Sequence, residues 1–197
     1  MEYVYTPATD PMGIDGWPTL SEMILTNKRV VIMLEYDANQ QQVPWLLNMC
    51  SYKWQTPFSS TNPEFPCTVQ RPPSQDRNTS ADRLYLANHN LNAGTELFGQ
   101  QILIPNTAAI NNTNSNTTDE GAALTTIEQC TGEWGRPRNF LLVGYYNFGN
   151  FNGSSLAAAA RANNVPQLIT VEYCQVKIIG LAWNGSRLME GAKRQIE

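Results

Sequence analysis

The stretch from Asn139 to Asn147 constrains the fold more than any other part of this sequence. It begins with an unbroken apolar run, Phe140 to Val143, continues with two tyrosines and an asparagine, and is followed by Gly149. A short apolar run rich in β-favouring residues and bounded by turn formers predicts a strand buried on both faces. Such strands belong to parallel sheets covered by helices, and α/β proteins place their ligands at the carboxyl ends of these strands.

Two more segments have this pattern of an apolar run with a polar carboxyl end. Arg29 to Tyr36 leads into an acidic end, and Leu84 to Asn90 ends in a polar triplet. Helices are expected at a capping box that starts at Thr19, at 43–49, within 95–110, at 121–130 and at 156–162, where Ser154 is the expected cap. Strands interleaved with helices predict an α/β fold. Three convincing strands are too few to close a (β/α)8 barrel, which typically takes about 250 residues.

Two long segments lack any regular pattern. Residues 51–82 are dense in Pro, Ser and Asn, and a loop of such length is often functional. Residues 111–119 form a low-complexity Asn/Thr segment, which predicts a mobile surface loop.

The composition narrows the classes of partner. The net charge is −4 and the pI is near 5.0, which argues against nucleic acid and against a basic membrane-binding face. Five N-glycosylation sequons in a weakly charged chain favour a secreted glycoprotein. The sequons begin at Asn78, Asn111, Asn116, Asn152 and Asn184.

The four cysteines are too far apart to form a metal-binding motif, so no metal site is predicted. Cys67 and Cys130 lie in polar, loop-like surroundings, and a disulfide between them is expected if the protein is secreted. Cys50 follows an apolar run and is expected to be a buried thiol.

The amino terminus has neither the basic start nor the apolar core of a signal peptide. No apolar run approaches the roughly 18 residues of a membrane span. A secreted-looking body without an export signal suggests that further sequence precedes Met1.

The polar strand ends supply the candidate catalytic residues. His89, the sole histidine, is either a general base at a strand end or a hydrogen-bonded structural imidazole, and alone the pattern favours the second interpretation. Glu35 and Asp37 are two residues apart, so they either divide acid and base roles or form a solvated turn. Tyr145 and Tyr146 either stack on a sugar or polyol ring or pack in the interior. The common hydrolase and nucleotide-binding motifs do not occur.

Five short motifs occur together and in order, and they carry a family resemblance. They are Trp17 to Leu20, Phe65 to Pro73, Asn88 to Asn92, Trp134 to Pro137, and Asn139 to Gly149. From about Tyr3 to Val165 the chain resembles the fungal secreted PLC-like phosphodiesterases, which are related to phosphatidylinositol-specific phospholipase C. The resemblance implies an extracellular protein.

That resemblance implies a (β/α)8 TIM barrel that cleaves phosphodiesters with a pair of histidines, aided by an arginine or a cation at the phosphate. The chain resembles only the last half of the barrel, as a partial domain over 1–165 followed by a divergent tail over 166–197. The catalytic histidines and a signal peptide are expected upstream of Met1. Gly144 stands where the family usually has an aspartate, and Glu35 where it more often has aspartate.

We therefore expect a PLC-like chain that lacks the histidine pair and is inactive alone. The alternative is a secreted, non-enzymatic glycoprotein that binds a polyol or glycan, and a third possibility is a fragment that self-associates through open barrel edges. No cofactor is expected, although the sequence does not exclude a divalent cation such as calcium. The candidate residues for binding a phosphodiester or polyol are Tyr36, Asn88, Asn90, Tyr146 and Asn147.

Overall fold

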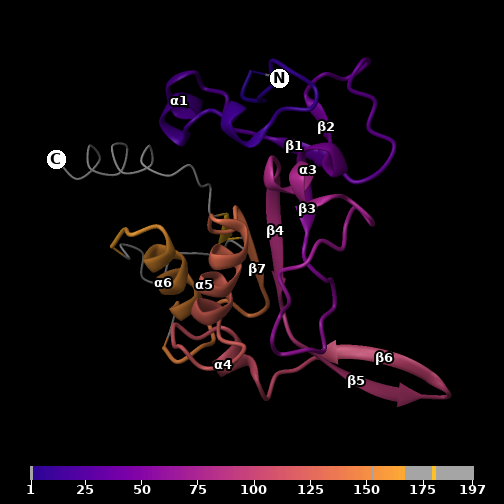
Figure 1. The fold of residues 1–197 in the computed structure, drawn as a ribbon, viewed down its shortest axis with the longest axis vertical. Helices are drawn as coiled ribbons and strands as arrows, with labels where there is room; N and C mark the ends of the chain where they lie inside the picture. Colours follow the sequence, from indigo (N-terminus) through magenta and orange to yellow (C-terminus); the bar gives the residue numbers. More distant parts are fainter. Residues whose placement is uncertain (1, 152, 167–178, 181–197) are drawn as a thin grey trace.

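A computed structural model describes residues 2–151, 153–166 and 179–180, and these residues form a mixed α/β structure (Figure 1). The central sheet has the strand order β3 (Lys53–Gln55), β4 (Leu84–His89), β7 (Phe140–Val143) and β8 (Ile179–Gly180). The first three of these strands run parallel, and β8 is antiparallel to β7. The α/β prediction is confirmed, and the described residues form no closed barrel.

Two small sheets accompany the central one. In one, β1 (Ile32–Leu34) pairs in parallel with β2 (Leu46–Asn48). The other is an antiparallel hairpin of β5 (Asn92–Leu97) and β6 (Gln100–Pro105), which projects from the body of the molecule (Figure 1).

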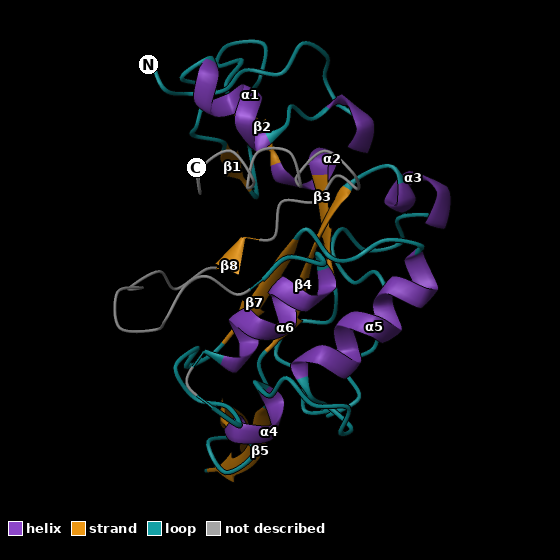
Figure 2. Cartoon of the chain, turned by 90° about the vertical axis from the view of Figure 1, so that its left-hand side faces the viewer, coloured by secondary structure: helices purple, strands orange, loops and turns teal. Residues whose placement is uncertain are grey.

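Two helices cover one face of the central sheet (Figure 2), α5 (Ala123–Trp134) and α6 (Ser154–Ala162). The shorter helices are η1 (Ile14–Gly16), α1 (Leu20–Leu25), α2 (Met49–Tyr52), α3 (Arg77–Ala81) and α4 (Ile110–Thr113). The capping box that starts α1 is confirmed, because the Thr19 side chain accepts from the Glu22 backbone and the Glu22 carboxylate accepts from the Thr19 backbone. No helix among the described residues is both long and apolar enough to cross a lipid bilayer.

The main core lies between the sheet and these two helices. Leu141 and Val143 of β7 pack with Leu124 and Ile127 of α5 and with Ala158 of α6. Burying each large apolar side chain contributes roughly 1.5–3 kcal/mol, so this contact fixes β7 and the loop that follows it.

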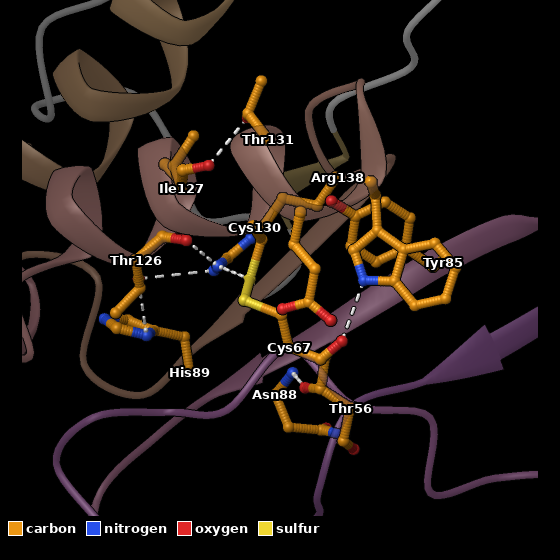
Figure 3. The surroundings of a disulfide bond; sticks show 12 residues. Thr56, Cys67, Tyr85, Asn88, His89, Thr126, Ile127, Cys130, Thr131 and Arg138 are labelled. Atoms are coloured by element: carbon orange, nitrogen blue, oxygen red, sulfur yellow. Dashed lines mark hydrogen bonds between the residues drawn. A yellow bond between two sulfur atoms is a disulfide. The ribbon is translucent and has the colours of Figure 1, made fainter. Parts of the chain in front are cut away.

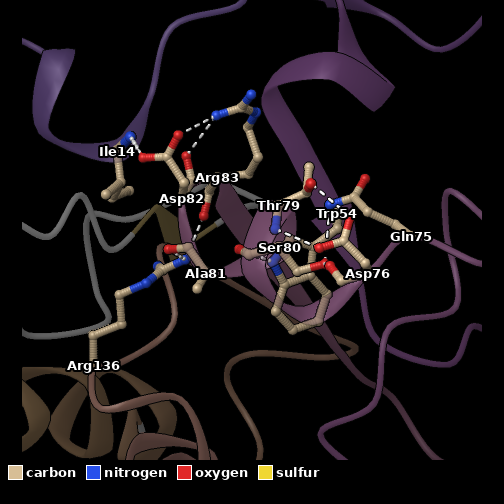
Figure 4. A network of polar contacts seen from close by, with 10 residues as sticks. All are labelled: Ile14, Trp54, Gln75, Asp76, Thr79, Ser80, Ala81, Asp82, Arg83 and Arg136. Carbon is tan, nitrogen blue, oxygen red and sulfur yellow. Dashed lines mark hydrogen bonds and ion pairs between the residues drawn. The ribbon is translucent and has the colours of Figure 1, made fainter.

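A second contact fixes β4 against β3. The rings of Trp54 and Tyr85 stack with their centroids 4.6 Å apart, and Trp134 packs on Trp54 at the same distance. Polar contacts around α3 hold the amino end of β4 (Figure 4). There the Trp54 indole donates to the carbonyl of Ser80 over 2.9 Å.

Several sequence-based predictions were wrong. The helix expected at 43–49 is strand β2, whose Leu47 is buried in a cluster with Tyr52. The helix expected within 95–110 is the β5–β6 hairpin, since Phe98 and Gly99 both take the left-handed backbone that a two-residue hairpin turn needs. Cys50 is only partly buried, and the N-cap of α6 is Gly153.

The two segments expected to be irregular also contain ordered structure. Residues 51–82 include β3 and α3. The predicted mobile loop at 111–119 is wrong for its first half, because the short helix α4 leads into residues 113–115, which are buried. A low-complexity sequence can be buried when its amide and hydroxyl groups find partners, as Asn114 does below.

Candidate functional site

A cavity of about 260 Å³ opens at the carboxyl ends of β4 and β7. The pairing of His89 with Val143 brings the next residues, Asn90 and Gly144, out of the sheet at the same edge. The lining residues come from the segments after β3, β4 and β7, from the base of the hairpin and from α4. They are Phe58, His89, Asn90, Leu91, Asn92, Pro105, Asn106, Ile110, Thr113, Asn114, Leu142, Val143, Gly144 and Tyr145.

Amide groups give the cavity its polar character. The Asn114 amide nitrogen donates to the carbonyls of Gly144 at 2.8 Å and Tyr145 at 3.0 Å, which fixes the orientation of its side chain. The Oδ1 atoms of Asn114 and Asn90 are buried and have no hydrogen-bond partner among the described residues. A buried acceptor without a partner costs about 1–3 kcal/mol, which the packing around these two side chains has to offset.

Among the described residues that line the cavity, His89 is the only one with an acidic or basic side chain. His89 is fully buried, and burial lowers its pKa to about 3, with the nearby Arg138 guanidinium adding to the shift. The imidazole is therefore neutral at physiological pH. The oxygen donors of the described lining residues are amides and hydroxyls without a carboxylate, so this wall lacks the charged oxygen ligands that Ca²⁺ sites usually include.

Both ring nitrogens of His89 are already engaged by the protein. Nε2 lies 2.7 Å from the carbonyl oxygen of Thr113, and Nδ1 lies 3.3 Å from the hydroxyl of Thr126. The Phe65 ring covers the imidazole, with the ring centroids 4.1 Å apart. These contacts describe a structural histidine that joins β4 to α4 and α5.

The two acidic candidates do not form a carboxylate pair on a strand. Strand β1 ends at Leu34, and Asp37 adopts a left-handed backbone with φ of 54°, so the alternation of side chains does not extend to it. Glu35 instead forms an ion pair with Arg71, with Nη1 and Oε1 3.1 Å apart. Arg71 also lies over the Phe58 ring, 5.0 Å from its centroid, beside the cavity.

The predicted binding residues have different environments. Asn90 lines the cavity, whereas Asn88 is buried beside it and donates to the Thr56 carbonyl, linking β4 to β3. Tyr146 packs against the main core, and Tyr145 rather than Tyr146 lines the cavity. Tyr36 and Asn147 are exposed and do not belong to the lining residues.

The sequence reasoning missed Asn106 and Asn114 as lining residues, and it missed Phe58. Asn106 lies in a segment predicted to be partly helical, and Asn114 lies in a segment predicted to be a mobile loop. A cluster of Asn residues near a strand end was the signal that could have indicated them.

Gly144 is not required by space or by backbone geometry. A Cβ atom at this position would meet only the Cβ of Asn90 at 3.9 Å, an ordinary van der Waals contact. A longer side chain could therefore project from position 144, and the glycine leaves this part of the cavity wall without an acid.

A disulfide ties the site to the helical layer (Figure 3). Cys67, in the segment after β3, is bonded to Cys130 of α5. Cys67 lies in a loop as expected, whereas Cys130 is helical, and both cysteines are buried. Arg138 lies beside them, with Nη2 2.9 Å from the Cys130 sulfur, and it also donates to the Thr126 carbonyl. Burial lowers the pKa of Arg138 to about 10, so this guanidinium stays charged.

Three of the sequons fall on described residues. Asn78 and Asn111 are exposed, while Asn116 is partly buried with its Oδ1 atom enclosed. Asn152 and Asn184 lie outside the described residues. No group of three or more His, Cys, Asp or Glu side chains among the described residues is placed to hold a metal ion.

Comparison with known proteins defines the class to which this fold and cavity belong. The PI-PLC X 1 family matches residues 1–158, so the chain belongs to the PI-PLC X family. No solved structure matches the chain.

Two fungal relatives are known in Arthroderma benhamiae. An "Uncharacterized secreted protein" is 46% identical over 165 residues, which are 84% of this chain and 37% of the relative. A "PI-PLC X domain-containing protein 1" is 30% identical over 150 residues, 76% of this chain and 46% of the relative. The chain thus spans less than half the length of either relative.

Proposed function

We propose that this chain is a PLC-like module that binds a neutral polyol ring and does not hydrolyse phosphodiesters by itself. The observation that carries the proposal is the state of His89, the only histidine in the sequence. It is buried and neutral, and both of its nitrogens are bonded within the protein, so it has no free nitrogen for proton transfer to a ligand.

The cavity supports a neutral ligand. A phosphodiester would need a free cation close to its oxygens. Beside the cavity, Arg71 is paired with Glu35, and Arg138 is buried and donates to the Thr126 carbonyl. A polyol instead offers hydroxyl groups to the partly exposed amide side chains of Asn92 and Asn106, while the Tyr145 ring supplies an apolar face. A cavity of about 260 Å³ suits a single ring.

Calorimetric titration with myo-inositol and with glucose tests the binding role. We expect weak, saturable binding, and Tyr145→Ala should reduce the affinity by at least about fivefold, the usual worth of one ring contact. Tyr36→Ala is the matched control, because Tyr36 is an exposed tyrosine that does not line the cavity. Equal losses in both variants, or no binding by the unmodified chain, would contradict a polyol site here.

The absence of hydrolysis is tested with phosphatidylinositol as substrate. We expect no turnover above the buffer blank at any pH between 5 and 8. Turnover that disappears in His89→Gln would show that the imidazole acts in catalysis and would overturn the proposal.

We also propose that residues 1–165 correspond to the last half of a TIM barrel, with a separate tail over 166–197. The parallel strands β3, β4 and β7 with helices on one face support this arrangement, as does the family match that ends at residue 158. An extracellular location is supported by the buried disulfide and by the relative that is named a secreted protein.

A further inference from the structure

The guanidinium of Arg138 is a buried positive charge without a carboxylate beside it. The side chain is 1% exposed, and among the described residues no Asp or Glu oxygen lies within ion-pair distance of it. Its hydrogen bonds go to uncharged atoms, the hydroxyl and carbonyl of Thr126 and the sulfur of Cys130, and its Nε atom has no partner among the described residues. Burying an ion without a counter-charge costs several kcal/mol, which these neutral contacts offset only in part.

Arg138 also dominates the charge around the Cys130 sulfur, which lies 2.9 Å from its Nη2 atom (Figure 3). Burial lowers the pKa of His89 to about 3 and raises the pKa of Tyr85, so both neighbouring side chains are neutral at physiological pH. Glu133, further along α5, is already in an ion pair with an arginine of α3. A cation beside a sulfur favours the thiolate over the thiol, so a reduced Cys130 would supply the counter-charge that Arg138 lacks.

The two sulfurs of the disulfide differ in how a thiol could reach them. Cys130 is fully buried in the middle of the helical layer. Cys67 lies between the partly exposed Pro66 and the exposed Thr68, within a stretch from 56 to 76 that belongs to no helix or strand. Opening such a stretch locally takes less free energy than unfolding a packed helix. An attacking thiolate therefore reaches Cys67, and Cys130 is the leaving group.

We propose that the Cys67–Cys130 bond is a redox-active disulfide that exchanges with dithiols, and that Cys130 leaves as a thiolate paired with Arg138. A thiolate of the dithiol attacks the Cys67 sulfur, the bond between the two cysteines breaks, and its electron pair stays on Cys130. The second thiol of the dithiol loses its proton to solvent and attacks the mixed disulfide, which releases Cys67 to take up a proton. The dithiol is oxidised to a disulfide by two electrons, and the protein disulfide is reduced. The first step is favoured because a thiol of lower pKa leaves faster.

Reduction would release the segment that covers His89. Phe65, two residues before Cys67, packs on the imidazole with the ring centroids 4.1 Å apart. The Trp134 indole donates to the Cys67 carbonyl over 2.8 Å, so it would become the main remaining tie between this segment and α5. Exchange with dithiols would thus loosen one wall of the cavity, whatever the cavity binds.

The ionisation of Cys130 is measured in a Cys50→Ser/Cys174→Ser background, where only the two cysteines of the disulfide remain. Adding Cys67→Ser leaves Cys130 as a free thiol, and the ultraviolet absorbance of the thiolate is followed against pH. We expect a midpoint at least about one pH unit below the ordinary value near 8.5. Adding Arg138→Met should return the midpoint to about 8.5 or above, whereas Arg138→Lys keeps a positive charge and should hold it between the two.

A second measurement does not depend on the folding of the Arg138 variants. Urea unfolding compares Cys67→Ser with Cys67→Ser/Cys130→Ser in the same background at pH 6 and pH 9. A pKa lowered by folding stabilises the folded state above the unfolded pKa, and this stability is lost as the pH falls through the folded pKa. From pH 6 to 9 the folding equilibrium of Cys67→Ser should therefore gain at least about fivefold over that of the variant without Cys130.

Exchange itself is followed by equilibrating the background protein, with both Cys67 and Cys130 present, against dithiothreitol without denaturant. We expect a reduced chain that keeps its near-ultraviolet circular dichroism, and Arg138→Met should shift the equilibrium toward the disulfide by on the order of tenfold. Three results would overturn the proposal: a Cys130 midpoint at or above 8.5 in the parent, no relative gain in stability at pH 9, or reduction that occurs only when urea unfolds the chain.

Discussion

At the scale of single residues, His89 shows how burial decides what a side chain can do. Its imidazole bridges the carbonyl of Thr113 and the hydroxyl of Thr126, and burial lowers its pKa to about 3. The unfolded chain has an ordinary histidine with a pKa near 6.5. Between about pH 3 and 6.5 the unfolded state therefore binds one more proton than the folded state, and stability must fall as the pH is lowered through this range.

This difference gives a quantitative prediction. From pH 7.5 to 5.0, His89 alone should lower the free energy of unfolding by about 2 kcal/mol. Urea unfolding at the two pH values, compared between the parent chain and His89→Gln, isolates this contribution because carboxylates titrate equally in both. The same pH dependence in both proteins would mean that the folded imidazole can be protonated.

The sequence predicted residue roles only where local pattern decides them. It supported a structural His89 and the Thr19–Glu22 capping box, because neighbouring residues indicate both. It could not indicate that Tyr145, rather than Tyr146, lines the cavity. Tyr145 has a left-handed backbone with φ of 52°, which interrupts the strand alternation that would assign the two side chains.

At the scale of elements, the buried strands were predictable and the exposed ones were not. Strands β4 and β7 both start with apolar runs; β4 is buried along almost its whole length, whereas β7, expected to be buried on both faces, alternates buried and partly buried residues. The β5–β6 hairpin has only the short apolar run Ile102 to Ile104, and its turn, Phe98-Gly99, lacks the usual Asn-Gly signal. Its strands were therefore mistaken for helix.

Two glycines with the same φ angle allow the backbone strain of a glycine-to-alanine change to be separated from the steric clash of the added Cβ atom. Gly99 and Gly121 both have φ of 75°. A Cβ at Gly99 would meet nothing within 4 Å, whereas at Gly121 it would lie 2.7 Å from the carbonyl oxygen of Pro63.

Gly99→Ala should thus cost only the left-handed backbone strain, about 1–2 kcal/mol. Gly121→Ala should cost a further 1–3 kcal/mol or so, because the backbone of Pro63 must move away. Thermal unfolding of both variants measures the difference. Equal destabilisation would indicate that the loop at Gly121 can shift freely.

At the scale of the whole molecule, the order of strands and helices along the sequence predicted the α/β class, but it did not predict which strands pair with one another in the sheets. Pairing depends on contacts between distant segments, such as the bond network that links Asn88 of β4 to Thr56 after β3. In the part of the chain that the structure describes, the outer edge of the central sheet at β3 makes only an isolated bridge from Gln55 to Arg71. Self-association through such an edge remains a prediction for gel filtration to test.

The disulfide is the covalent link between the site and the helical layer, and its effect on stability can be predicted from the length of chain that it closes. Cys67 and Cys130 are 63 residues apart in sequence. Closing a loop of this length removes unfolded-state entropy worth about 4 kcal/mol, so Cys67→Ser/Cys130→Ser should lose about that much stability in urea unfolding. Cys50→Ser is the control, because Cys50 is a free thiol and should tolerate the change nearly unaltered.

The buried Arg138 guanidinium lies beside the disulfide and gives a second reason to expect that loss of the disulfide destabilises the protein. The Arg138 guanidinium donates hydrogen bonds to the Cys130 sulfur and to the Thr126 carbonyl, and the Thr126 hydroxyl in turn contacts His89. Loss of the disulfide should therefore loosen the cavity wall as well as the helix, and polyol affinity should fall together with stability. A double variant that unfolds at the same urea concentration as Cys50→Ser would show that packing alone holds α5 on the sheet.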